Sequence, residues 1–115
     1  LAYYSAMTGK LGPASRNTRL FMMPGMGHCF EGNGPQFADF LGEMDRWQAT
    51  GVAPERIVAE KPVNYLLALA GVKAEPLMTR PICAWPKVAH YTGKGSLDRA
   101  ANFTCQAAGA SGARH

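Results

Sequence analysis

The clearest pattern in the chain is an apolar stripe along one face of a predicted helix between residues 35 and 51. Its five members fall within about 120° of one another at 100° per residue, and they are Phe37, Phe40, Leu41, Met44 and Trp47. Asp39, Glu43 and Arg46 fall on the opposite face, where we expect them to be solvated. Burial of the stripe would contribute on the order of 10 kcal/mol before the entropy cost. A sheet or another helix is therefore needed to cover it.

Both ends of this helix carry sequence signals. Asn33 or Gly34 can cap the start, and Pro35 suits the first turn. Gly51 is a natural stop, because glycine adopts the left-handed conformation that commonly follows a helix.

An earlier helix is predicted at the start of the chain. Its apolar positions recur at roughly helical spacing, at Leu1, Tyr4, Met7 (or Thr8) and Leu11. Gly9 and Gly12, with Pro13, end it, and a polar turn follows over residues 13–18. The chain starts with Leu1, uncapped and in place of Met, and shows no signal peptide, so we expect a truncation in or just before a helix.

Short apolar runs predict two strands. Residues 19–23 form a nearly continuous apolar run of the kind found in buried strands of parallel sheets. Residues 56–60 form a second strand, which Pro62 limits. Residues 64–70 can form one or two helical turns.

From Glu75 onward, proline and turn residues dominate, and we expect loops without regular structure. Cys83 and Cys105 bracket this section. A bridge between them would close a loop of about 22 residues and remove roughly 3 kcal/mol of unfolded-state entropy. Residues 107–115 are expected to fray.

Composition limits the classes of partner. Hydrophobic residues make up 47% of the chain and charged residues only 17%, so we expect some surface to be covered by another part of the protein. The net charge is +4 without any cluster of basic residues, which argues against nucleic acid. The longest strongly apolar run, residues 65–72, is too short to cross a bilayer, so no membrane partner is expected.

His28 is the best candidate for chemistry. It follows an apolar run, lies in a glycine-rich loop and precedes the amphipathic helix. The ends of strands are where sites assemble in doubly wound sheets, and an imidazole there can accept and return a proton near neutral pH. A structural loop histidine is the alternative. Nucleophilic catalysis also requires a hydroxyl and a carboxylate, and the sequence contains no Gly-x-Ser-x-Gly motif.

A metal site would combine His28 with Cys29, and His90 is a further candidate ligand. Adjacent residues rarely both bind one ion, and no third ligand has suitable spacing. We therefore expect neither a metal nor a cofactor in this segment. The chain has three cysteines and no Cys-x-x-Cys pair, so in an oxidising compartment two can pair while one is left over.

Four segments together resemble the tannase and feruloyl esterase family. The first runs over residues 19–29 and ends in Pro-Gly-Met-Gly-His-Cys. The others, in the family's order, are residues 51–59, residues 80–86 with the pattern Arg-Pro-x-Cys-x-x-Pro, and residues 101–105.

The resemblance implies a fold, a reaction and a location. The fold class would be α/β, as the C-terminal fragment of an α/β-hydrolase with a loop-rich, disulfide-stapled tail. Residues 1–74 would belong to the hydrolase core, and residues 75–115 would be an extension of the same domain. The family contains secreted or periplasmic serine esterases that cleave esters of aromatic acids, of the gallate or hydroxycinnamate type.

The resemblance also implies roles for single residues. His28 would be the triad histidine, Cys29 would pair with a cysteine beside the nucleophilic serine outside this chain, and Cys83 would pair with Cys105. The serine, the triad carboxylate and a lid that can bind calcium precede these residues in family members. The partners would then be the N-terminal remainder of the enzyme and an aromatic ester, and the isolated chain would be inactive, with oligomers possible. The rival interpretation is a non-catalytic, disulfide-stapled secreted interaction module.

Overall fold

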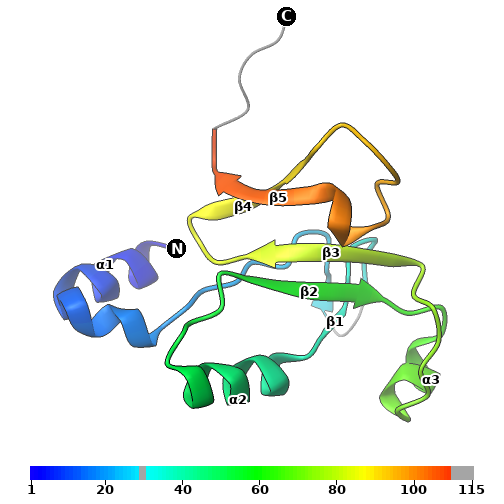
Figure 1. Cartoon of the computed structure of the whole chain (residues 1–115), viewed down its shortest axis with the longest axis horizontal. Helices are drawn as coiled ribbons and strands as arrows, with labels where there is room; N and C mark the ends of the chain where they lie inside the picture. The colour runs from blue at the N-terminus through cyan, green and yellow to red at the C-terminus, as the bar shows by residue number, and fades with distance from the viewer. Residues whose placement is uncertain (29–30, 110–115) are drawn as a thin grey trace, which may run out of the picture.

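The computed structural model describes residues 1–28 and 31–109, which form two small antiparallel sheets and several short helices (Figure 1). The elements in chain order are α1 (Ala2–Leu11), η1 (Gly12–Asn17), β1 (Phe37–Ala38), α2 (Phe40–Thr50), β2 (Arg56–Lys61), α3 (Tyr65–Leu69), β3 (Met78–Cys83), β4 (Lys87–Tyr91), η3 (Ala100–Asn102) and β5 (Phe103–Ala107). In the view of Figure 1, β4 and β5 lie above the larger sheet, and α2 and α3 lie below it. None of the described helices combines the length and apolar character that crossing a bilayer requires.

The larger sheet has the order β1-β2-β3. Along β2, Ile57 and Ala59 are buried while their neighbours are exposed, because successive side chains of a strand point to opposite faces. Ile82 lies opposite Ile57 in the register and completes the core cluster, against which Phe21 and Met23 pack. The predicted strand over residues 56–60 is confirmed.

The smaller sheet pairs β4 with β5 and is joined to β3 by a disulfide between Cys83 and Cys105, whose Cα atoms are 5.7 Å apart. Arg80 of β3 also places its guanidinium carbon 4.2 Å from the centre of the Phe103 ring. The expected loop-rich tail is therefore wrong, because β3, β4 and β5 occupy much of it. Proline suggested a break in the chain, but Pro81 lies in β3, an edge strand of its sheet, where a residue without an N–H is tolerated.

Residues 19–23 do not form the expected buried parallel strand. Phe21 makes only an isolated antiparallel bridge with Ala84, and the Leu20 carbonyl accepts a hydrogen bond of 2.8 Å from the Trp85 N–H. A strand of a parallel sheet is buried because other elements cover both faces of the sheet. Here Leu20 and Phe21 instead pair with Trp85 and Ala84, which directly follow β3.

The predicted amphipathic helix is real but starts later than expected. Asp39 is its N-cap and accepts a 2.9 Å hydrogen bond from the Gly42 N–H, while Phe37 and Ala38 form β1. The expected stop at Gly51 is confirmed, with φ of 69°. Three members of the apolar stripe are open to solvent, with Leu41 81% exposed, whereas Phe37 and Trp47 are half-buried.

The helices predicted at the start of the chain and within residues 64–70 are also present, as α1 and α3, but Gly9 lies inside α1, which continues to Leu11. Asn64 caps α3 by accepting from the N–H groups of Leu66 and Leu67. The ladder between β2 and β3 joins the two parts that the expected division at residue 74 separates. That division stays a prediction.

Candidate active site: the histidine hairpin

His28 lies at the tip of a small hairpin, residues 24–34, which we call the His28 hairpin. The Gly34 N–H donates a 2.8 Å hydrogen bond to the Gly25 carbonyl, and the Gly27 N–H donates to the Glu31 carbonyl. An isolated bridge between residues 26 and 32 lies between these two bonds. The chain therefore reverses direction between Gly27 and Glu31, and His28 directly follows Gly27.

The hairpin is so narrow that glycine is required at two positions. A Cβ on Gly32 would lie 2.2 Å from the Gly25 carbonyl oxygen, and its φ of +101° disfavours other residues. A Cβ on Gly34 would lie 2.3 Å from the Pro24 carbonyl oxygen. The glycine-rich composition that marked this loop in the sequence thus has a physical cause.

The chain on each side of the reversal is attached to the larger sheet, and we call residues 19–23 the first leg and residues 32–36 the second leg. The first leg packs Phe21 and Met23 against the core cluster. The second leg is held by two hydrogen bonds to β2 and its end: the Gln36 N–H donates to the Glu60 carbonyl at 2.8 Å, and Lys61 Nζ donates to the Gly32 carbonyl at 3.4 Å. The hairpin thus projects from a fixed base.

The His28 residue is exposed, and its carbonyl accepts a 3.3 Å hydrogen bond from the Glu31 N–H. An exposed imidazole on an anchored hairpin is accessible to a reacting group, as a general base must be. Cys29, the other site residue predicted in this loop, lies outside the described residues.

The serines and the second histidine among the described residues lie in other elements. Ser5 is in α1, Ser15 is in η1, and Ser96 precedes η3, so none of them belongs to the hairpin. His90, considered above as a metal ligand, is in β4. Among residues 1–28 and 31–109, no group of three or more histidine, cysteine or acidic side chains could hold a metal ion.

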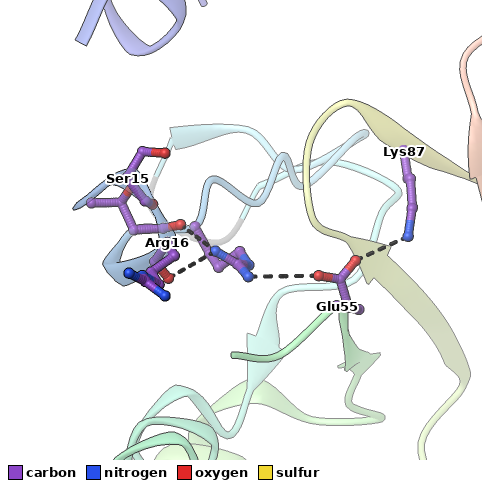
Figure 2. A network of polar contacts seen from close by, with 6 residues as sticks. Ser15, Arg16, Glu55 and Lys87 are labelled. Carbon is purple, nitrogen blue, oxygen red and sulfur yellow. Dashed lines mark hydrogen bonds and ion pairs between the residues drawn. The ribbon is translucent and has the colours of Figure 1, made fainter. Parts of the chain in front are cut away.

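A charged network lies beside the first leg of the hairpin. Glu55 pairs with Arg19 at 3.7 Å and with Lys87 at 3.0 Å. Figure 2 shows Glu55 with Lys87 on one side and the turn carrying Ser15 and Arg16 on the other. Sequence reasoning did not single out this network. The sequence did contain one indication of it, because Arg19 and Glu55 both lie within the segments that carry the family resemblance.

Comparison with known proteins places this hairpin in a family context. The family model described as "Tannase and feruloyl esterase" matches residues 1–106. Mono(2-hydroxyethyl) terephthalate hydrolase of Piscinibacter sakaiensis is 34% identical over 105 residues, covering 91% of this chain and 16% of the relative. An uncharacterized esterase of Xanthomonas campestris pv. campestris is 41% identical over 102 residues, covering 76% of this chain and 17% of the relative.

A solved structure shows the same fold over most of the chain. The crystal structure of an esterase from Aspergillus oryzae matches with a TM-score of 0.70 and 24% identity, covering 91% of this chain and 23% of that chain. The chain thus spans about one sixth of the two curated relatives, at 16% and 17% of their lengths. Since the family model matches residues 1–106, the chain belongs to the tannase and feruloyl esterase family.

Proposed function

We propose that the chain is part of a serine esterase of the α/β-hydrolase fold, and that His28 is its general base. The observation that carries the proposal is the position of His28 at the exposed tip of a glycine-built, doubly anchored hairpin in a member of an esterase family. The nucleophilic serine and the triad carboxylate belong to the part of the enzyme outside these 115 residues.

In the proposed reaction, the His28 imidazole first accepts a proton as a base and then donates it as an acid. As the serine oxygen bonds to the ester carbonyl carbon, its proton passes to His28. Collapse of the tetrahedral intermediate breaks the bond to the alcohol, and His28 returns the proton to the leaving oxygen. Water then attacks the acyl-enzyme while His28 accepts a proton. His28 passes this proton to the serine as the acid is released.

The proposed substrates are esters of aromatic acids, of the gallate or hydroxycinnamate type. The family name and a relative named as a terephthalate ester hydrolase support this class. Binding such a substrate also requires a pocket for its aromatic ring, which the hairpin alone does not form. We therefore assign the binding of the aromatic ring to the remainder of the enzyme.

The same remainder is proposed to cover the open face of α2. Phe40, Leu41 and Met44 are 47%, 81% and 57% exposed on this helix. Exposed apolar patches of this kind mark surfaces that other protein covers. The low share of charged residues, 17%, agrees with a segment whose surface is partly internal to a larger molecule.

We expect the isolated 115-residue chain to be inactive on gallate and ferulate esters, because the nucleophilic serine and the triad carboxylate are proposed to lie in the remainder of the enzyme. The measurement is ester hydrolysis by the purified chain, with the full-length enzyme as the positive control. Measurable turnover by the isolated chain, above a matched His28→Ala preparation, would contradict the proposal.

Export to an oxidising compartment, by secretion or into the periplasm, is proposed from the disulfide between Cys83 and Cys105 and from the family. We further propose that Cys29 pairs with a cysteine beside the nucleophilic serine. This bond would hold the base and the nucleophile together across distant parts of the chain.

We expect Cys29 to be protected from alkylation in the native full-length enzyme and to become reactive after reduction. Mass spectrometry of the alkylated peptides measures this. Cys83 serves as the internal reference, because the structure pairs it with Cys105. Alkylation of Cys29 in the native, unreduced enzyme would argue against the pairing.

A further inference from the structure

Arg19 connects several parts of the molecule that surround the His28 hairpin. One terminal nitrogen of its guanidinium donates to the carbonyl oxygens of Thr18 at 2.8 Å and Arg16 at 3.1 Å. The other terminal nitrogen lies 3.7 Å from a carboxylate oxygen of Glu55. The guanidinium carbon also lies 5.6 Å from the centre of the Trp47 ring. A single side chain thus meets a turn, a helix and the start of a strand.

These contacts lie on both sides of the hairpin along the chain. Arg19 begins the first leg, which runs directly into the hairpin. Trp47 belongs to α2, which follows the second leg and β1. Glu55 directly precedes β2, the strand to which the second leg is hydrogen-bonded through Glu60. Arg19 therefore cross-links the chain before the hairpin to the chain after it.

We propose that Arg19 is a positioning residue for His28, in a role that rests on the function proposed above. A general base must lie within hydrogen-bond reach of the hydroxyl it deprotonates, and an error of about 1 Å can cost about 10²-fold in rate. The Arg19 side chain is only 23% exposed, so its contacts are largely shielded from solvent. By joining both flanks of the hairpin, Arg19 limits movement of the base that the hairpin carries.

The planar fork of arginine is essential to this role. Lysine could keep the charge near Glu55 and Trp47, but its single nitrogen could not serve both the two carbonyls and the Glu55 carboxylate, which Arg19 meets with separate terminal nitrogens. The ion pair itself contributes less, because the Glu55 side chain is 58% exposed and surface pairs are weak. We therefore attribute the cross-link mainly to the contact with Trp47, while the bonds to the Arg16 and Thr18 carbonyls hold the guanidinium in place on the first flank.

The test compares variants of the full-length enzyme on a gallate or ferulate ester, with kcat and KM determined separately. We expect Arg19→Gln to lower kcat by about 10- to 100-fold while KM changes by less than about twofold. Arg19→Lys should recover part of this loss. Trp47→Leu, which leaves Arg19 in place, should lower kcat in the same direction. Lys87→Gln removes a charge from the same network at 3.0 Å from Glu55, and should leave kcat within about twofold.

Each rate is divided by the fraction of folded enzyme, taken from circular dichroism and thermal unfolding. The role of Arg19 is overturned if Arg19→Gln and Trp47→Leu keep kcat within about twofold while His28→Ala abolishes it. The role of Arg19 is also overturned if the decrease in kcat of Arg19→Gln disappears after division by the folded fraction, or if the substitution changes KM instead of kcat. A His28→Ala enzyme with unchanged kcat would instead overturn the proposed function, and with it the role of Arg19.

Discussion

His28→Ala in the full-length enzyme is expected to lower kcat by about 10⁴-fold or more. Without the imidazole, the serine hydroxyl keeps its proton during attack, and the leaving alcohol receives none from the enzyme. Binding of the ester depends on other parts of the molecule, so KM should change far less than kcat. Initial rates over a range of ester concentrations separate the two constants.

The matched control for this variant is Met26→Ala, which shortens a side chain on the same hairpin that is 41% exposed. We expect the control to retain its kcat, because the hairpin is closed by backbone hydrogen bonds that the substitution leaves in place. A loss of less than tenfold in His28→Ala would remove His28 from the mechanism.

Loss of the disulfide is expected to have the largest effect on stability. Replacing Cys83 and Cys105 together by alanine should lower the free energy of unfolding by about 3 kcal/mol. The sequence separation of 22 residues sets the size of the loop that the bond closes in the unfolded chain. Guanidinium unfolding of the variant and of the oxidised parent measures the difference.

Two controls make this prediction specific to the bond. Thr104→Ala changes an exposed neighbour in β5 and should leave the unfolding midpoint nearly unchanged. Reduction of the parent protein should reproduce the midpoint of the double variant. Equal midpoints for the oxidised parent and the double variant would show that the bond adds no stability.

Local signals in the sequence were sufficient for some elements. The short apolar run in residues 56–60 identified β2, of which only one face is buried, and Gly51 marked the end of α2 because its φ is positive. The start of α2 was misplaced because Phe37 has the periodicity of the helix but pairs with Glu60 in β1. Pairing partners that lie far along the chain are invisible to periodicity.

The candidate site shows the same limit. The glycines and His28 are neighbours in sequence, so the hairpin was recognisable as a shaped loop. The cross-link made by Arg19 depends on Trp47 and Glu55, which approach it only after the chain has folded. The strands of the tail were missed because proline was interpreted as a break, whereas Pro81 occupies an edge.

The double attachment of the His28 hairpin has a consequence for protein engineering. One leg is bonded at Leu20 to Trp85, and the other at Gln36 to Glu60. A cassette for transplanting the loop into another hydrolase must therefore extend from residue 19 to at least residue 85. A shorter graft would transfer the glycines and the imidazole without the residues that hold one of the two legs in this protein.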